Sequence, residues 1–177
     1  MTAPSRPTAT GPALREFMRR WPGGIAVVTG AAAEADPVGC TVNAFISVSL
    51  RPPTLLVSLA QGSRTLAAIA RHGRFCVNVL AVGQRGLVAR FSGPGDRFAG
   101  VAFHWEHEVP VLDGVAAAAV CEVTRIVPAA DHAMVLGTPR WSRQNEASYP
   151  IVYFAGAYYT LSHEADWSSI EPNRSTA

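Results

Sequence analysis

Residues 39–50 carry alternating polar and apolar side chains. The polar side chains of one parity are Thr41, Asn43, Ser47 and Ser49, and the apolar ones of the other parity are Val42, Ala44, Ile46, Val48 and Leu50. Successive side chains of a strand point to opposite faces, so the pattern predicts one strand with an apolar face and a face of small hydrogen-bonding groups. A half-solvated strand explains this pattern by itself. The polar face also suits a planar ligand with polar edges and a phosphorylated tail, and both interpretations stay open at this point.

The rest of the chain predicts many short strands and a few short helices. Helices are expected at residues 13–21, with an apolar stripe of Leu14, Phe17, Met18 and Trp21, at residues 64–71 after the cap residue Ser63, and at residues 84–91. Strands are expected at residues 25–29, 54–59, 74–80, 103–108, 115–127, 132–141, 151–154 and 158–161, with loops at 31–37 and 92–100. This order favours a mainly β antiparallel barrel or sandwich. We expect one domain at residues 13–162, between a flexible leader at 1–12 and a polar tail at 163–177.

Composition narrows the class of protein. The chain has 177 residues, 49% of them hydrophobic and 16% charged, which is typical of a compact single domain. A net charge of +2 gives no indication of nucleic-acid binding or of a polybasic membrane contact, and no apolar run approaches the ~20 residues of a membrane span. The three cysteines, Cys40, Cys76 and Cys121, lie far apart, which predicts neither a disulfide framework nor a zinc site. We therefore expect a cytoplasmic protein without a metal.

The chemistry-bearing residues fall in three polar clusters within apolar surroundings. The first is the 39–50 segment, and the second is residues 61–65, where Ser63, Arg64 and Thr65 stand at a predicted helix start that favours an anion. The third is Asn78, an amide inside an apolar strand. Each has an ordinary structural explanation, such as helix capping by Ser63. The glycine motifs of Rossmann and P-loop nucleotide sites are absent from the sequence, so the clusters together indicate a different nucleotide-like cofactor site.

Eight short motifs, in order, resemble one known family. They are residues 21–29 (Trp-Pro-Gly-Gly-Ile to Val-Thr), 41–49, Pro52-Pro53, Ser63-Arg64-Thr65, residues 75–80, Arg90-Phe91, residues 96–101 with 110–114, and Asp131-His132. In this order the chain resembles the flavin reductase-like, FMN-binding split-barrel family, from about residue 17 to residue 161. That family includes the reductase components of two-component flavin monooxygenases.

The resemblance implies a Greek-key split β-barrel with a few short helices, a homodimer, and reduction of FMN or FAD by NADH or NADPH. Hydride would pass from nicotinamide C4 to flavin N5, and reduced flavin would go to a partner monooxygenase. The residues implied to bind the flavin are Thr41, Val42, Asn43, Ala44, Ser47, Val48, Ser49, Ser63, Arg64, Thr65, Asn78, Arg90 and Phe91. Those implied for the nicotinamide nucleotide are Pro22, Gly23, Gly24, Ile25, Tyr158, Tyr159 and His132, with His132 also the catalytic candidate. Finishing the turn after Pro128 is the alternative role of His132.

Two positions depart from the family pattern. Gly23 stands where family members commonly have Thr, and Tyr159 stands where they commonly have Arg. The missing Arg removes a cation that would meet a nucleotide phosphate. Two alternatives to a flavin reductase therefore stay open: a split-barrel flavoprotein that retains FMN and acts on another substrate in a biosynthetic pathway, and a non-catalytic flavin-binding protein.

Overall fold

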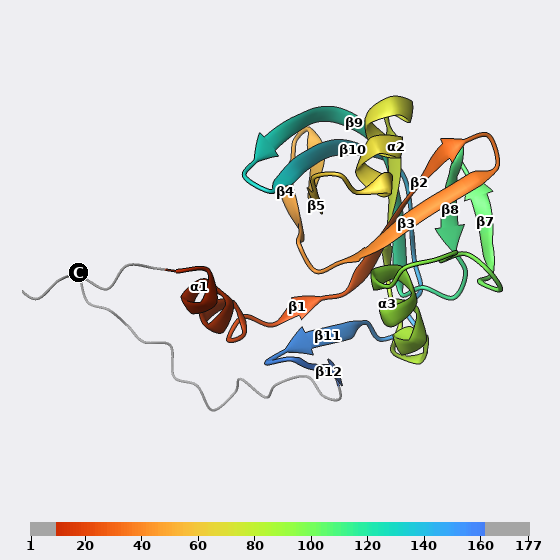
Figure 1. Cartoon of the computed structure of the whole chain (residues 1–177). Helices are drawn as coiled ribbons and strands as arrows, with labels where there is room; N and C mark the ends of the chain where they lie inside the picture. Colours follow the sequence, from red (N-terminus) through yellow and green to blue (C-terminus); the bar gives the residue numbers. More distant parts are fainter. Residues whose placement is uncertain (1–9, 162–177) are drawn as a thin grey trace, which may run out of the picture.

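The computed structural model describes residues 10–161, which fold mainly as β-strands with three short α-helices (Figure 1). The expected leader at residues 1–12 meets the described part only at residues 10–12, where helix α1 (Gly11–Met18) has already begun. The expected tail at residues 163–177 lies outside the described residues. None of the helices within residues 10–161 is long and apolar enough to cross a membrane.

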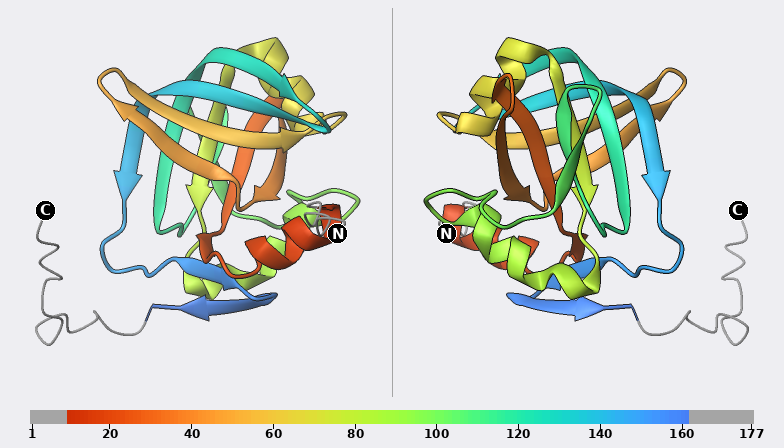
Figure 2. Two further views of the ribbon diagram at one scale, coloured as in Figure 1. Left: turned by 90° about the vertical axis from the view of Figure 1, so that its left-hand side faces the viewer. Right: turned by 90° about the vertical axis from the view of Figure 1, so that its right-hand side faces the viewer.

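A seven-stranded antiparallel sheet forms the body of the molecule. Its strands are β2 (Ala26–Ala33), β3 (Asp36–Val42), β4 (Phe45–Leu50), β5 (Pro53–Ala60), β6 (Arg74–Val79), β9 (Ala117–Ala129) and β10 (His132–Gln144). The spatial order is β3-β2-β6-β9-β10-β5-β4, so the β4–β5 hairpin crosses over to lie beside β10, a Greek-key type of connection. The sheet curls into a barrel that stays open, because its edge strands β3 and β4 do not pair with each other (Figure 2). The expected mainly β split-barrel architecture is confirmed.

Two small sheets flank this barrel. The hairpin of β7 (Phe103–Glu106) and β8 (Val109–Leu112) packs on β2 and β6. A three-stranded sheet joins β1 (Gly23–Gly24), β11 (Ile151–Phe154) and β12 (Ala157–Thr160) below the barrel in Figure 1. Thus segments from both ends of the described chain meet in one sheet.

Strand β2 is buried on both faces and separates two apolar clusters. Val28 faces the first cluster, inside the barrel, where Phe75 and Ile69 of helix α2 (Arg64–His72) pack. Val27 faces the second, outside the barrel, with Phe91 of helix α3 (Arg85–Ser92) and Leu112 of β8. The short 3₁₀ turn η1 (Val82–Gln84) leads into α3. The two helices are thereby fixed on opposite sides of the same strands.

The predicted strand at residues 39–50 is wrong in one respect, because the structure breaks it at residues 43–44. Its first half belongs to β3 and its second half to β4, which turns away to pair with β5. Val42 is buried in the core, whereas Ile46, Val48 and Leu50 of the same parity are 58%, 48% and 81% exposed. The predicted apolar face is therefore two separate surfaces. Only the first of them is covered by this chain.

Several other element boundaries in the structure differ from the predicted ones, for identifiable reasons. Helix α2 with its Ser63 cap and the strand at 151–154 are confirmed. The predicted strand at 103–108 becomes the β7–β8 hairpin, since His107 and Glu108 take the positive φ values of a tight turn. The predicted loop at 31–37 is mostly strand, and only residues 34–35 form the turn. Helix α1 ends before Trp21, and none of its residues is buried.

Candidate functional site

A large cleft runs along the free edge of β3. It has a volume of about 1100 Å³, slightly above the usual range of ligand sites. All of β3 lines it, together with residues 43–44, 58–60, 62–65, 91–92 and 94–99 and His132. The cleft thus collects six segments around one unpaired strand edge. If β3 were paired on both sides, as in a closed barrel, its backbone groups would not be free to line a cleft.

The unpaired edge of β3 is itself a source of hydrogen-bonding groups. The N–H and C=O of one residue point to the same side of a strand, and successive residues alternate. Gly39 O points away from β2, since it accepts a hydrogen bond from Arg97 Nη1 at 2.7 Å. The backbone groups of Thr41, two residues on, therefore point into the cleft as well. A flat ligand with polar edges would find donors and acceptors along this strand.

Glycine at position 39 suits the tight packing beneath the cleft. A Cβ atom there would lie 3.0 Å from Cε1 of Phe91 and 3.2 Å from Cγ2 of Thr29, so a larger residue would make these neighbours shift. Phe91 itself is fully buried and stacks edge-on against Phe98 at 5.1 Å between ring centroids. The expected Phe91 is therefore a supporting side chain on the cleft wall.

Helix α2 begins at the wall opposite β3. Ser63 Oγ accepts a hydrogen bond from Leu66 N, as an N-cap does, which leaves the N–H groups of Arg64 and Thr65 without helical partners. Ser63, Arg64 and Thr65 all line the cleft, and their expected role in binding a flavin stays a prediction. Two hydroxyl groups, a guanidinium and a helix start together favour an anion at this point.

Arg97 is the cleft residue that the sequence reasoning missed. Its Nη1 donates to Gly39 O and its Nε donates to Gly93 O at 2.8 Å, so the guanidinium fastens the 93–99 loop across the edge of β3. Arg90, which was expected in the site, instead donates to Ala99 O at 2.6 Å and supports that loop from outside the cleft. Arg97 belongs to the motif of residues 96–101, but the sequence does not indicate that the folded loop places its guanidinium against Gly39 O.

Cys40 marks the middle of the cleft. Burial raises the pKa of its thiol, while the hydroxyl of Thr65, the guanidinium of Arg97 and the hydroxyl of Ser63 act in the opposite direction. These three groups therefore surround the same point of β3 from two walls. The Arg97 guanidinium and the hydroxyl groups of Ser63 and Thr65 therefore lie near Gly39 and Cys40.

His132 lies at one end of the cleft, as the first residue of β10 opposite Ala60 of β5. Its Nδ1 is 2.8 Å from Asp131 Oδ1, and this hydrogen bond lowers the pKa of the Asp131 carboxyl. Gln61 holds the turn in place: its backbone N–H donates to Asp131 O at 2.8 Å, and its Nε2 donates to His132 O at 3.2 Å. The corner before α2 and the turn that carries His132 are thus tied together.

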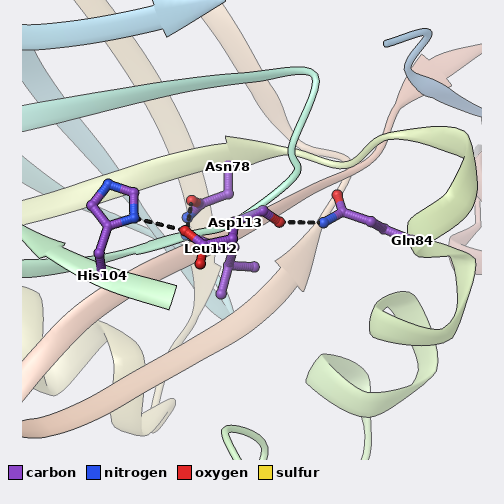
Figure 3. A network of polar contacts seen from close by, with 5 residues as sticks. All are labelled: Asn78, Gln84, His104, Leu112 and Asp113. Carbon is purple, nitrogen blue, oxygen red and sulfur yellow. Dashed lines mark hydrogen bonds and ion pairs between the residues drawn. The ribbon is translucent and has the colours of Figure 1, made fainter. Parts of the chain in front are cut away.

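Asn78 is not part of the cleft, which corrects the expectation that it faces the flavin. It is fully buried, and its Nδ2 donates to Val27 O at 3.0 Å and to Thr29 Oγ1 at 3.1 Å. Its Oδ1 accepts a hydrogen bond from Leu112 N at 2.8 Å (Figure 3). Its Nδ2 is thus used within the main sheet, by β2, and its Oδ1 docks β8 on that sheet.

Several other predicted residues also lie away from the cleft. Ser47, Val48 and Ser49 are on β4, which contributes no lining residue, and Ser49 Oγ accepts a hydrogen bond from Arg51 N. Thr41 does line the cleft, but its hydroxyl donates to Val88 O of α3 at 2.9 Å. Residues that the structure does bring together, besides those discussed, are Val42, Asn43 and Ala44.

The nicotinamide candidates other than His132 form a separate group. Pro22 to Ile25 and Tyr158 to Tyr159 do not line the cleft; Gly23 and Gly24 pair with β11, and both tyrosines lie on β12. Gly23 nevertheless approaches the Asn43 end, where a Cβ on it would lie 3.9 Å from Asn43 O. The small sheet therefore adjoins the end of the cleft near Asn43, without forming its wall.

Comparison with known proteins decides the family. The model of the flavin reductase like domain matches residues 18–162. The chain belongs to this flavin reductase-like family. It is 37% identical over 150 residues to a probable flavin reductase of Rhizobium meliloti (strain 1021), covering 84% of this chain and 48% of that protein. It is 36% identical over 163 residues to the flavin reductase (NADH) of Kitasatospora aureofaciens, covering 88% of this chain and 84% of that protein.

A solved structure gives the same result for the fold. The styrene monooxygenase flavin reductase from Pseudomonas putida S12 superposes with a TM-score of 0.79 at 33% identity, covering 86% of this chain and 99% of that chain. The present chain spans about half the length of the Rhizobium relative, 48%. The match to the family model, at residues 18–162, covers nearly all of the described residues.

A flavin fits the cleft of this family member. Its ring edges need donors and acceptors, which the β3 edge supplies, and its phosphate needs the hydroxyl and cationic groups gathered near Cys40. The apolar side chains of Val42 and Ala44 border the same space. Neither Asn78 nor β4 contributes to this lining.

Proposed function

We propose that this chain is a flavin reductase that oxidises NADH or NADPH and reduces FMN or FAD in the β3 cleft. It would supply the reduced flavin to a partner monooxygenase. The observation that carries this proposal is the cleft itself. The free edge of β3, the start of α2 and Arg97 all border it. Membership in the flavin reductase-like family and the NADH-dependent relative support the same reaction.

The residues of the chain would bind and orient both reactants. A bound flavin supplies the acceptor for a hydride, so the protein needs no acid–base pair for that step. The β3 edge and Asn43 would hold the ring, and Ser63, Arg64 and Thr65 would hold the phosphate side. His132, oriented by Asp131, would donate a hydrogen bond to the nicotinamide nucleotide or to the reduced ring. Correct placement of the two rings would then account for most of the rate.

The direct test measures oxidation of NADH and NADPH by purified protein with FMN and with FAD, under anaerobic conditions, together with release of reduced flavin. Turnover with at least one pair is expected. Failure of all four pairs would refute the proposal.

A matched pair of variants tests the site. Arg64 and Arg71 lie on the same helix α2, but only Arg64 lines the cleft. Arg64→Met should raise the KM for flavin by about tenfold, since a charge-assisted hydrogen bond is lost. Arg71→Met should leave it unchanged. Equal effects of the two substitutions would argue against a phosphate site at the start of α2.

A second function is favoured by the small sheet. Gly23 and Tyr159 replace the family's common Thr and Arg, and neither lines the cleft. A protein whose nicotinamide site is weakened by these two replacements would retain FMN and act on another substrate. Such a protein would be isolated yellow, with tightly bound flavin and negligible oxidation of either nicotinamide nucleotide. The assay above separates the two functions.

We also propose that the chain forms a homodimer through α1 and β4. Both elements lie on the same side of the molecule in Figure 1. Leu14, Phe17 and Met18 of α1 are exposed, as are Ile46, Val48 and Leu50 of β4. An edge strand with an exposed apolar row pairs or aggregates unless another surface covers it. A second copy of the same face would cover both elements at once.

Light scattering after size-exclusion chromatography tests the dimer. Val48→Glu should give a monomer, because it places a charge in the contact. Val82→Glu is the matched control, since Val82 is 44% exposed against 48% for Val48 but lies in η1. A wild-type monomer, or loss of the dimer in both variants, would contradict the proposed interface.

The state of the cysteines supports the expected compartment. Cys40, Cys76 and Cys121 are all free thiols in the structure. Free, separated cysteines are typical of proteins kept in a reducing environment. We therefore retain the cytoplasm as the proposed location.

A further inference from the structure

Strand β12 is the outer strand of the small sheet, and its far edge is free. The order of that sheet is β1-β11-β12, so β12 pairs only with β11 (Figure 2). Ile151 of β11 uses its backbone elsewhere, since its N–H donates to Leu80 O and its C=O accepts from Ile25 N. Thr160, opposite Ile151, therefore exchanges no hydrogen bonds with it, and its N–H and C=O point to the free edge. By the alternation along a strand, the same holds for Tyr158.

This edge lacks the protection that the edge of β3 has. Natural edge strands are protected by proline, by lysine or another charge, or by a covering segment. Ala157–Thr160 contains neither a proline nor a charged residue, and every one of its residues is exposed. Tyr158 and Tyr159 are 37% and 52% exposed. A strand of this kind readily accepts a further strand.

A cation marks one face of β12. The Cζ atom of Arg85, at the start of α3, lies 5.3 Å from the ring centroid of Tyr158, in a cation–π contact. Within residues 10–161, no carboxylate lies within ion-pair distance of Arg85. Tyr159 points to the opposite face, where its ring centroid is 6.3 Å from that of Phe154. One face of β12 is thus cationic and aromatic, and the other is aromatic alone.

We propose that the free edge of β12 binds an extended acidic segment of a partner protein by strand addition. The backbone groups of Tyr158 and Thr160 would pair with the added strand, and Arg85 would bind a carboxylate on the same face. A second copy of β12 fits less well. Two-fold antiparallel pairing would place both Arg85 guanidinium groups on one face, where like charges repel each other. The net charge of +2 likewise favours an acidic partner.

The position of β12 gives this contact a use. Neighbouring strands lie about 4.8 Å apart, so β12 is roughly 10 Å from β1, whose Gly23 approaches the Asn43 end of the cleft. A partner added to β12 would stand beside that end of the cleft without entering it. Under the proposed function, on which only the identity of the partner rests, this protein is the monooxygenase that receives the reduced flavin.

Amide hydrogen exchange of Tyr158 and Thr160, followed by NMR in the purified full chain, tests the site with a probe peptide. The probe is a short capped peptide of alternating Val and Glu, and its controls replace Glu by Lys or place a Pro at the centre. The Val–Glu peptide, at millimolar concentration, should slow exchange of both amides about tenfold, and both controls should leave it unchanged. No slowing by the Val–Glu peptide, equal slowing by the Val–Lys peptide, or slowing at β4 instead would overturn the proposal.

Two pairs of variants locate the contact. Arg85 and Arg143 are both exposed, and each stacks on an aromatic ring, Arg143 on Trp141 at 5.9 Å. Arg85→Gln should weaken binding of the Val–Glu peptide about tenfold, and Arg143→Gln should leave it unchanged. Thr160→Pro removes an outward N–H and should abolish binding, whereas Thr160→Val keeps the N–H and should keep the binding. Equal losses within either pair would contradict the proposal.

Exchange in the protein alone separates the other occupants of this edge. Both amides should exchange as exposed backbone does. Slow exchange that increases with protein concentration would mean that a second copy covers β12, and slow exchange at every concentration would mean that residues 162–177 of this chain cover it. Either result overturns the proposal. Peptide binding needs no turnover, so its failure is distinct from failure of the flavin reductase assay, which tests the proposed function.

Discussion

Replacing Asn78 by Leu should destabilise the protein strongly while leaving the flavin site intact. Asn78 makes three hydrogen bonds in a fully buried position, to Val27 O, to Thr29 Oγ1 and from Leu112 N. Leu has the same branched side-chain skeleton as Asn, is somewhat larger and has no polar atom, so the substitution removes all three hydrogen bonds without opening a cavity. The Leu112 N–H then stays buried without an acceptor. Thr29 remains partly satisfied, because its hydroxyl also donates to Pro110 O.

The magnitude follows from these contacts. One buried donor left without a partner costs about 1–3 kcal/mol, and loss of the donor to Val27 O adds roughly 1 kcal/mol. The free energy of unfolding should therefore fall by about 2–4 kcal/mol. For a chain of this size, that change lowers Tm by roughly 4–16 °C. Figure 3 shows why the β7–β8 hairpin would loosen first: Leu112 and Asp113 are where the hairpin meets Asn78 and Gln84.

Urea and thermal unfolding, each with a flavin titration of the folded protein, check this reasoning. Asn145→Leu is the control, since the Asn145 amide makes its hydrogen bonds only at the exposed surface, donating to Ser148 Oγ and accepting from Ala147 N. It should change stability by less than about 0.5 kcal/mol. If Asn78→Leu kept wild-type stability but lost affinity for flavin, the residue would be a ligand contact after all, and its placement in the core would be refuted.

Three further predictions concern the cleft. Asn43→Leu should weaken flavin binding by about 0.5–1.5 kcal/mol through loss of one polar contact, and unchanged affinity in the folded variant would remove Asn43 from the site. Gln61→Glu keeps the shape of the side chain but replaces the donor to His132 O by an acceptor, so the KM for NADH should rise about three- to tenfold with flavin affinity unchanged. Gln61→Lys restores a donor and should bring the KM for NADH back towards the wild-type value. Equal losses in both Gln61 variants would contradict this positioning role. The hydrogen bond from His132 lowers the pKa of Asp131, so its carboxylate should stay ionised further into acid, and the small stabilisation that it gives should vanish only as pH falls through that lowered value. Carboxyl NMR titration should show the pKa rising towards its ordinary value in His132→Ala, and no rise would contradict the assignment.

The sequence predicted those parts of the structure that depend on neighbouring residues. Ser63 identified the start of α2, because a cap residue and the periodicity after it are local signals. The strand at 151–154 was predicted to the residue, since its apolar run is bounded by Pro150 and by the turn at Ala155 and Gly156. The residues at that helix start also line the cleft, as expected from the same local chemistry.

The parts that the sequence did not predict depend on partners distant in the chain. Alternation at residues 39–50 could not reveal that β4 leaves β3 to pair with β5, because both strands satisfy the same period. An amide within an apolar strand requires hydrogen bonds, but nothing near Asn78 in sequence indicates that Leu112, 34 positions later, supplies one. Arg97 was a motif residue without a role until the 93–99 loop brought it to Gly39.

The free edge of β3 connects these observations. An unpaired strand edge is a liability in most proteins, which protect it with charge, proline or a covering segment. Here Pro37 and Asp36 occupy its outer end, and Arg97 fastens a loop across Gly39, so another strand cannot add to it. The same features leave a groove in which only a narrow, flat molecule can meet the strand. If the cleft binds flavin as proposed, the same residues protect the edge and contact the ligand, and loosening the Arg97 contact should impair both.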